Sequence, residues 1–379
     1  MTDETRIQSP EKSTASSEGR PGLVRVGITQ GDTNGVGFEL ILRTFADSAL
    51  LDLLTPVVYG HIKAAAHHRK ALNLNTPLHI VNNGDEAEDG RLNFVNISDE
   101  DIKVEYGRPS SDAGRAAYLA LDRAVSEYKQ GMIDVLVTAP INKADIQSAK
   151  FNFPGHTEFL QARLGADDEE ALMILFNNLM RVALVTTHLP LSEVSTAVSR
   201  ELVERKIRLL YDSLRRDFLI STPRIAVLAL NPHCGDAGLL GLEEQEVIAP
   251  AVSTLSEVGL PCFGPYAADG FFGSGMYRHF DGILAMYHDQ GLAPFKALSV
   301  DDGVNFTAGL PLVRTSPDHG TAYDIAGRGI ANLGSFRSAL FAAVDIFRRR
   351  ETYDQAEADP LPKLFHDKKD EGERPDHRA

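Results

Sequence analysis

Short apolar runs alternate with longer polar segments along most of the chain, from about residue 23 to residue 350. Runs of this length that are rich in Val, Ile and Leu are typical of strands buried on both faces of a sheet. They predict strands at 24–29, 56–60, 134–140, 173–177, 181–187, 224–230 and 282–287. Helical periodicity and capping residues predict helices at 61–74, 110–129, 200–217, 243–255 (kinked at Pro250) and 335–350. This alternation predicts an α/β fold with a mostly parallel sheet.

The length and the two ends of the chain set the expected domain organisation. A chain of 379 residues exceeds what one hydrophobic core normally holds, so we expect two lobes. Residues 1–21 are rich in Ser, Thr, Glu and Pro, a composition that predicts a disordered tail. Residues 351–379 carry many charges and are predicted to form a second tail outside the fold.

The charge balance and the cysteine content narrow the expected partners and compartment. Acidic residues outnumber basic ones by 53 to 38, which gives a formal charge of −15. Such a surface repels nucleic acid and anionic lipid, so neither is an expected partner. The two cysteines form no CxxC pair, and no apolar stretch approaches the roughly 18 residues of a membrane helix. The polar N-terminal segment also lacks the apolar core of a signal peptide, and these features together predict a cytoplasmic protein.

The turn after the first predicted strand is rich in glycine, with Gly31, Gly35 and Gly37 in the segment GDTNGVGFEL. A glycine-rich turn before a helix can bind an anion through its free amides, and it can also serve only as a tight turn. The spacing is not GxGxxG, so the sequence does not support a Rossmann dinucleotide-binding fingerprint. In the next predicted helix, the adjacent His67 and His68 are predicted to lie on a solvated face.

Three of the predicted buried strands are followed by a histidine, namely His188, His233 and His288. The carboxyl ends of parallel strands meet at one edge of a sheet, where α/β proteins bind ligands. Three imidazoles at such an edge favour a divalent metal with open coordination positions, although a structural hydrogen bond is the commoner role of any single one. Asp269 and Asp289 are candidates for additional or supporting ligands.

A set of cationic and amide side chains accompanies the histidines. Lys296 and Arg314 lie downstream of the third histidine, and arginine can bind a phosphate or carboxylate with two parallel hydrogen bonds. Together with His156, Thr157 and Asn305, they predict a pocket for a small anion beside the metal. A metal that holds an alcohol oxygen lowers the pKa of that hydroxyl, so a general base can remove the proton while hydride leaves the carbon.

Longer motifs surround these residues. They are VTAPINKAD, FPGHTEFL, RVALVTTHLPL, LALNPHCGD, ILAMYHDQGLAPFK, GVNFTAGLPLVRTSPDHGTAYDIAGRG and GSF. Across about residues 24–350 the chain resembles the 4-hydroxythreonine-4-phosphate dehydrogenase family of pyridoxal phosphate (vitamin B6) biosynthesis. Two positions in the first glycine turn depart from the family pattern, Asn34 and Phe38, where the family usually has Ala and Pro.

The resemblance implies a two-lobed α/β/α fold like that of isocitrate and isopropylmalate dehydrogenases. Residues 22–145 and 300–350 would form a discontinuous first lobe, and residues 146–299 a second lobe with the metal site and the dimer contacts. It also implies a homodimer whose active site is shared between subunits. The implied reaction is the oxidation of 4-phosphooxy-L-threonine by NAD, after which the β-keto acid loses CO2 and gives 3-amino-2-oxopropyl phosphate.

The resemblance also assigns site residues, motif by motif. His188, His233 and His288 match the family's ligands for a divalent ion, for which Zn, Mg, Co and Mn are candidates. The residues that match its contacts with a small phosphorylated substrate are His156, Thr157, Lys296, Asn305 and Arg314. The expected catalytic residues are the three histidines with Lys296 and Asp269.

Three other functions compete with this one. A paralogous branch of the family oxidises four-carbon sugar acids such as erythronate 4-phosphate or threonate 4-phosphate. The same three histidines would also suit a metal-dependent hydrolase or lyase that uses no nicotinamide cofactor. The third alternative is a non-catalytic protein that binds phosphorylated metabolites, and an open metal site argues against it.

Overall fold

The computed structural model describes residues 22–165, 170–299 and 301–360. The predicted tail at 1–21 and residues 361–379 of the second predicted tail lie outside this part of the chain. The strands are β1 (Arg25–Thr29), β2 (Thr55–Gly60), β3 (His79–Val81), β4 (Asn93–Asn96), β5 (Val135–Thr138), β6 (Leu172–Phe176), β7 (Arg181–Leu184), β8 (Ile225–Leu228), β9 (Cys262–Tyr266), β10 (Gly282–Ala285), β11 (Val304–Ala308) and β12 (Val313–Pro317). The α-helices are α1 (Gly37–Thr44), α2 (Ile62–Ala71), α3 (Ser111–Lys129), α4 (His156–Leu164), α5 (Leu191–Ala197), α6 (Arg200–Arg216), α7 (Ala249–Glu257), α8 (Ala268–Gly273), α9 (His288–Leu298) and α10 (Gly334–Ala358).

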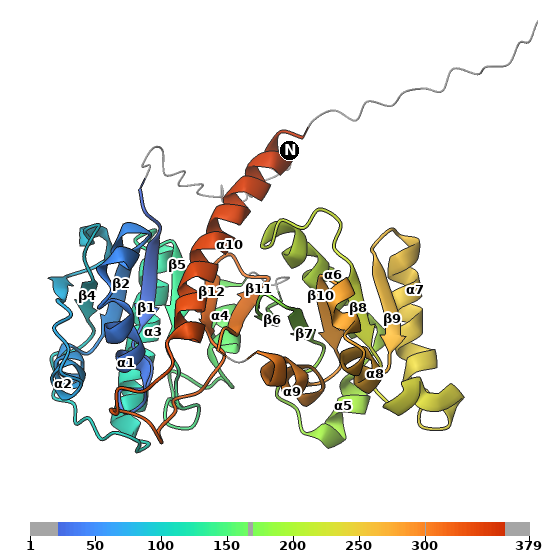
Figure 1. The fold of residues 1–379 in the computed structure, drawn as a ribbon, viewed down its shortest axis with the longest axis horizontal. Helices are drawn as coiled ribbons and strands as arrows, with labels where there is room; N and C mark the ends of the chain where they lie inside the picture. Colours follow the sequence, from blue (N-terminus) through green and yellow to red (C-terminus); the bar gives the residue numbers. More distant parts are fainter. Residues whose placement is uncertain (1–21, 166–169, 300, 361–379) are drawn as a thin grey trace, which may run out of the picture.

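The strands of the described residues form one sheet in the order β3-β4-β2-β1-β5-β12-β11-β6-β7-β10-β8-β9. Neighbouring strands are parallel in both outer parts of the sheet and antiparallel at β12–β11, β11–β6 and β6–β7. Strands β1 to β5, β11 and β12 occupy one half of the sheet, and β6 to β10 occupy the other half (Figure 1). The chain therefore starts in one half, crosses to the second and returns. The predicted α/β class with a mostly parallel sheet is confirmed, while the predicted lobe limits stay a prediction.

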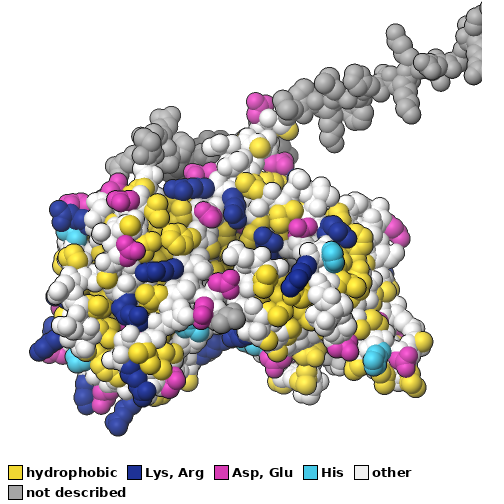
Figure 2. All heavy atoms as spheres, viewed as in Figure 1, with side chains coloured by type: hydrophobic (Ala, Val, Ile, Leu, Met, Phe, Trp, Pro, Cys, Tyr) yellow, Lys and Arg dark blue, Asp and Glu magenta, His cyan; other side chains and the backbone are white. Residues whose placement is uncertain are grey.

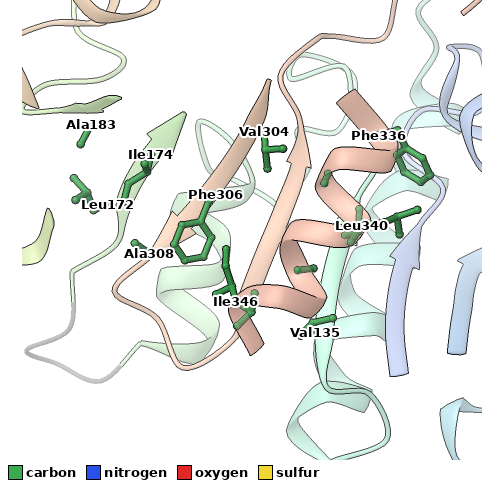
Figure 3. Packing of buried hydrophobic residues seen from close by; sticks show 14 of the residues in the cluster. Val135, Leu172, Ile174, Ala183, Val304, Phe306, Ala308, Phe336, Leu340 and Ile346 are labelled. Atoms are coloured by element: carbon green, nitrogen blue, oxygen red, sulfur yellow. The ribbon is translucent and has the colours of Figure 1, made fainter. Parts of the chain in front are cut away.

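Helix α10 covers the middle of the sheet, where it packs on β12, β11 and β5. Figure 3 shows Ile346 of this helix beside Phe306 of β11, with Leu340 and Phe336 further along the helix. All four side chains are at most 1 % exposed. Burial of a Phe, Leu or Ile side chain contributes about 1.5–3 kcal/mol, so this apolar layer holds β11 and β12 firmly in place. These two strands carry residues of the predicted anion pocket.

All seven predicted strands are confirmed, with ends displaced by at most three residues. The sequence interpretation missed β3, β4, β9, β11 and β12, and it missed helices α5, α8 and α9. In β11 and β12, Asn305, Arg314 and Ser316 interrupt the apolar pattern because they line a cavity. A strand that presents polar side chains to a ligand site does not show the apolar run that marks a buried strand.

The predicted helices are present, with differences at their ends. Helix α3 begins after Ser110, whose hydroxyl accepts a hydrogen bond from the N–H of Ala113, as the predicted cap requires. The helix predicted at 243–255 starts as a π-helix, η4 (Glu244–Ile248), and continues as α7 with Pro250 in its first turn, where proline is tolerated. Helix α8 lies in a glycine-rich segment for which no helix was predicted. None of the helices in the described part is long and apolar enough to cross a membrane.

The prediction of a charged tail from residue 351 is wrong for its first eight residues, because α10 continues to Ala358. Asp354 accepts hydrogen bonds at 2.8 and 2.6 Å from Nε and Nη2 of Arg216, and Glu357 pairs with Arg215 at 3.5 Å. Both arginines lie on α6, so charge pairing between two helices extends α10 beyond the sheet (Figure 1). A bidentate pair of this kind is stronger than a single exposed contact.

The glycine turn after β1 serves the fold. The N–H of Asp32 donates to the carbonyl of Pro140, and the N–H of Asn34 donates to the Asp32 side chain. The N–H groups of Gly35 and Val36 donate to the carbonyl oxygens of Asp32 and Thr321. These amides are engaged within the protein, which favours the tight-turn interpretation over the anion-binding one.

His68 contradicts the prediction of a solvated histidine pair. It is 0 % exposed, its Nε2–H donates to the carbonyl of Thr33 at 2.7 Å, and its ring meets Tyr106 edge-on at 4.9 Å. Burial lowers the pKa of His68 to about 4. Because this pKa lies below that of an exposed histidine, the unfolded chain binds more protons at mildly acidic pH. The stability linked to His68 is present above about pH 6.5 and is lost as the pH falls towards 4.

We therefore expect a fall in the free energy of unfolding of about 2 kcal/mol from His68 alone between about pH 7.5 and about pH 5. Urea unfolding at both pH values measures it. The variant His68→Asn should show a smaller pH dependence, whereas His67→Asn, which changes the exposed neighbour, should match the wild type. Equal pH dependence in all three proteins would show that His68 does not titrate in this range.

Candidate active site

A cavity of about 220 Å³ lies where the two halves of the sheet meet. Its walls come from β6, β11, β12, the end of β5, the first residue of α4, one face of α9, and the loops that follow β5, β7 and β12. Six of the sequence-predicted site residues line it, and they are His156, His188, His288, Lys296, Asn305 and Arg314. Folding thus brings together side chains that are far apart along the chain.

Arg314 is the buried cation of this cavity. Its side chain is almost fully buried, with Nε and Nη2 donating to Oγ1 of Thr138 at 3.1 and 2.6 Å, and Nη1 donating to Oγ1 of Thr307 at 3.3 Å. No carboxylate forms an ion pair with it among the described residues. Burial lowers the pKa of Arg314 to about 10, so the guanidinium stays charged at neutral pH. A buried charge without a counterion is costly, and a bound anion would relieve that cost.

Two buried polar atoms in the cavity have no hydrogen-bond partner, Nε2 of His156 and Oδ1 of Asn305. Burial holds the pKa of His156 well below its usual range, and the positive charges of Arg314 and Lys143 lower it further. The imidazole is therefore neutral at physiological pH and can give or accept one hydrogen bond at Nε2. Unpaired buried polar atoms are rare in folded proteins, so this pair indicates a site for a polar ligand.

The rings of His188 and His288 lie side by side, with centroids 6.2 Å apart. Nδ1 of His188 is 3.5 Å from a carboxylate oxygen of Glu158, and Nδ1 of His288 is 2.7 Å from one of Asp289. A carboxylate at Nδ1 fixes the tautomer in which Nε2 carries the free lone pair, as in many metal-binding histidines. The ammonium group of Lys143 lies 3.1 Å from Nε2 of His188, so this lone pair already faces a cation.

Three of the predicted site residues do not join the cavity. His233 is exposed on the loop after β8, and Asp269 is exposed on α8. Oγ1 of Thr157 lies 3.5 Å from Oγ1 of Thr307, the hydroxyl that also accepts a hydrogen bond from Arg314. The described residues contain no group of three or more His, Cys, Asp or Glu side chains that could hold a metal. The predicted convergence of three imidazoles is therefore not found within one chain.

His233 and Asp269 both lie outside this cavity, and Asp269 is near the residue that follows His233. Burial raises the pKa of the thiol of Cys234, the residue next to His233, and the negative charges of Glu244 and Asp269 raise it further. Asp269 therefore lies near the turn that carries His233.

The site residues assigned from the resemblance did not include several residues that line the cavity or contact its histidines. These are Thr138, Lys143, Glu158, Asp318 and His319. Lys143 and Asp318 share a signal with the predicted histidines, because each follows the end of a strand. Glu158 has no such signal, since its part in the site depends on the carboxylate reaching His188 from helix α4.

A second cavity of about 260 Å³ adjoins the first and shares Asp318 and His319 with it. Its other walls are Val36, Asp301, Ala322, Ile325, Ala331, Asn332 and Ser335. The loop that carries most of them is held by Glu39, whose buried carboxylate accepts hydrogen bonds from the N–H groups of Gly329 and Ala331. Two connected cavities can hold two ligands side by side.

The charge pattern of the surface differs from that of the cavity. On the face shown in Figure 2, Lys and Arg side chains are interspersed with Asp and Glu. This face of the described residues carries no continuous basic stripe of the kind that nucleic-acid-binding proteins present.

A family model described as the pyridoxal phosphate biosynthetic protein PdxA matches residues 52–343. The 4-hydroxythreonine-4-phosphate dehydrogenase of Bacteroides thetaiotaomicron is 57% identical to this chain over 351 residues, which are 93% of this chain and 96% of that protein. The protein of the same name from Prosthecochloris aestuarii is 40% identical over 324 residues, which are 84% of this chain and 96% of that protein.

Solved structures agree with the sequence matches. The 4-hydroxythreonine-4-phosphate dehydrogenase of Klebsiella pneumoniae matches with a TM-score of 0.74 and 32% identity, over 86% of this chain and 100% of that chain. The one from Burkholderia phymatum matches with a TM-score of 0.69 and 37% identity, over 86% of this chain and 98% of that chain. The chain therefore belongs to the family of the pyridoxal phosphate biosynthetic protein PdxA, whose relatives named above are dehydrogenases.

Proposed function

We propose that this chain is an NAD-dependent, divalent-metal-dependent dehydrogenase of pyridoxal phosphate biosynthesis. It would oxidise 4-phosphooxy-L-threonine, and the resulting β-keto acid would lose CO2 to give 3-amino-2-oxopropyl phosphate. The observation that carries the proposal is the cavity in which an unpaired buried guanidinium and two unpartnered polar atoms stand beside two imidazoles. The names of the relatives support the same substrate.

The cavity side chains suit a phosphorylated hydroxy amino acid. Arg314 and Lys296 supply positive charge for the phosphate, and the neutral His156 can hydrogen-bond a phosphate oxygen without adding charge. Oδ1 of Asn305 can accept a hydrogen bond from the ammonium or hydroxyl group of the substrate. A hydrogen bond to an otherwise unpartnered buried polar atom contributes about 1–3 kcal/mol, so each of these contacts favours substrate binding.

The donor set at His188 and His288 fits a divalent ion. Both Nδ1 atoms face carboxylates, and Nε2 of His188 already faces the Lys143 ammonium. A divalent ion at this position supplies Lewis acidity, which lowers the pKa of an alcohol that it holds. Lys143 and Lys296 are the cations of this chain that can stabilise negative charge on the keto oxygen while the carboxylate leaves as CO2.

A second copy of the chain would supply the third histidine. His233 and Asp269 are exposed, and the same loop exposes Leu239, Leu240 and Leu242 at 79, 45 and 48 %. Clustered exposed leucines are typical of surfaces that another protein covers. In a two-fold dimer the same surface of each subunit meets the other, so His233 and Asp269 of each could complete the site of its partner. The homodimer with a shared active site is therefore part of the proposal.

The second cavity is the proposed NAD site. Val36, Ala322, Ile325 and Ala331 give it apolar walls for a nucleotide base, and Asn332 and Ser335 give it polar groups. Bound NAD would accept the hydride, and Asp318 and His319, which border both cavities, lie where cofactor and substrate would meet. The absence of a GxGxxG turn agrees with a dinucleotide site on this loop.

An NADH absorbance assay tests the proposed function directly. The purified protein with Zn²⁺, NAD and 4-phosphooxy-L-threonine should form NADH and release CO2 in equal amounts. Erythronate 4-phosphate, offered under the same conditions, should react more slowly in kcat/KM by at least about 100-fold, because it has no ammonium group for the pocket. Faster oxidation of erythronate 4-phosphate would assign the chain to the sugar-acid branch. Substrate loss without NADH would point to a hydrolase or lyase.

A further inference from the structure

The loop that carries His233 has an unusual backbone. In the turn segment η3 (Pro232–Gly238), five consecutive residues from His233 to Ala237 have φ angles between 45° and 77°. Four of these residues are not glycine. A left-handed conformation costs an L-residue about 1–2 kcal/mol, so the turn persists only because its surroundings hold it.

Two neighbouring carboxylates contact the start of this turn: Glu243 accepts one hydrogen bond from Nδ2 of Asn231 at 2.7 Å, and the buried Glu244 makes the other contacts. Oε1 of Glu244 accepts hydrogen bonds from the N–H groups of Leu230 and Asn231 at 2.8 and 2.7 Å, and its Oε2 accepts one from Nδ2 of Asn231 at 3.1 Å. Gly235 passes so close that a Cβ there would meet Oε2 of Glu244 at 2.7 Å. The carboxylate therefore contacts both the entry and the middle of the left-handed turn.

Glu244 is placed there by a second rare backbone feature. It is the first residue of the π-helix η4 and is only 2 % exposed. No lysine or arginine forms an ion pair with it in the described part of the chain. Burying a carboxylate without a cation lowers the free energy of unfolding, and the hydrogen bonds from three N–H groups offset this desolvation cost without adding a net gain. π-helical turns are frequent at functional sites.

We infer that Glu244 is a positioning residue for His233: it keeps the left-handed turn in the shape that presents this imidazole to a metal shared with the partner subunit. The inference rests on the proposed function, because it takes His233 to be a metal ligand. It adds a residue that acts through the turn and touches neither metal nor substrate. The histidine needs this support because its exposed side chain has no hydrogen bond to the body of its own subunit among the described contacts.

The test is the Zn²⁺ affinity of the full-length protein, measured by competition with a chelator, for the wild type and Glu244→Gln. The amide would place an NH2 group against the NH2 group of Asn231, which opens the turn. Loss of a group that supports a metal ligand typically weakens metal binding by about 10–100-fold, and we expect that fall here. Glu246→Gln, an exposed change on the same π-helix, is the matched control and should bind Zn²⁺ like the wild type.

A double-mutant cycle separates positioning from a general loss of structure. In a His233→Ala background, Glu244→Gln should weaken Zn²⁺ binding no further, since both changes act through the same imidazole. Additive effects, or wild-type affinity in Glu244→Gln, would overturn the inference. If His233→Ala itself leaves Zn²⁺ affinity unchanged, the ligand set of the proposed function fails instead.

A second variant covers the case in which Glu244→Gln does not fold, as judged by circular dichroism. Asn231→Ala keeps the buried carboxylate and its two backbone hydrogen bonds but removes the side-chain hydrogen bonds that link the turn to Glu244 and to Glu243. This variant should also weaken Zn²⁺ binding. In the His233→Ala background it should have no further effect on Zn²⁺ affinity. Unchanged Zn²⁺ affinity in this folded variant would equally contradict the inference.

Discussion

Replacing Arg314 by methionine should raise KM for 4-phosphooxy-L-threonine by about 100-fold, which corresponds to about 2.7 kcal/mol. Methionine keeps an unbranched side chain of comparable reach but removes the charge that has no carboxylate partner in the described part of the cavity. The KM for NAD should stay close to the wild-type value, because Arg314 does not border the second cavity. Steady-state kinetics with each substrate varied in turn measures both constants.

The control for this prediction is Arg348→Met, which removes an exposed guanidinium from α10. It should leave both KM values unchanged, and thermal melting should show that both variants are folded. An equal rise of the two KM values in Arg314→Met would indicate a general disturbance of the site and contradict the assignment of Arg314 to the substrate anion.

His188→Ala and His233→Ala should each bind Zn²⁺ much more weakly and lose almost all turnover, and a mixture of the two variants should recover activity. In a two-fold dimer with shared sites, a mixed dimer contains one site with both mutations and one site with neither. Random exchange of subunits makes half of the dimers mixed, so recovery should reach about a quarter of wild-type activity. Each variant alone should lose on the order of 10³-fold or more in kcat, the range expected for loss of a catalytic metal.

The matched control is His279→Ala, which removes an exposed histidine that lines neither cavity. It should retain full activity and Zn²⁺ content. Mass spectrometry of the mixture shows whether mixed dimers have formed. If mixed dimers form and the mixture stays inactive, His233 does not serve the site of the partner. Full activity of His188→Ala without bound metal would contradict the metal-dependent mechanism as a whole.

Local patterns accounted for the framework of this protein. The apolar runs at 134–140 and 224–230 predicted β5 and β8 because a strand buried on both faces is apolar at nearly every position. Ser110 predicted the start of α3 because a side-chain cap acts within one helical turn. Strand-end positions also identified His188 and His288, because the loops that follow parallel strands all lie at the same edge of the sheet.

Other features depended on contacts between distant parts of the chain. Two neighbouring histidines in α2 look alike in the sequence, yet His68 is buried under Tyr106 and His67 is exposed. Charge pairing with α6 extended α10 into a segment whose composition predicted a tail. Strands β11 and β12 lacked an apolar run because their polar residues turn into the cavity.

The residues alone established an α/β protein with imidazoles, cations and amides suited to a phosphorylated substrate, because residue type and local periodicity carry that information. They could not say which of three equivalent histidines share a cavity. Long-range packing settled that question: the rings of His188 and His288 lie side by side at the cavity, while His233 is exposed in a left-handed turn and lines neither cavity. The sign of φ and the direction of an exposed side chain follow from distant hydrogen bonds, which no local pattern encodes.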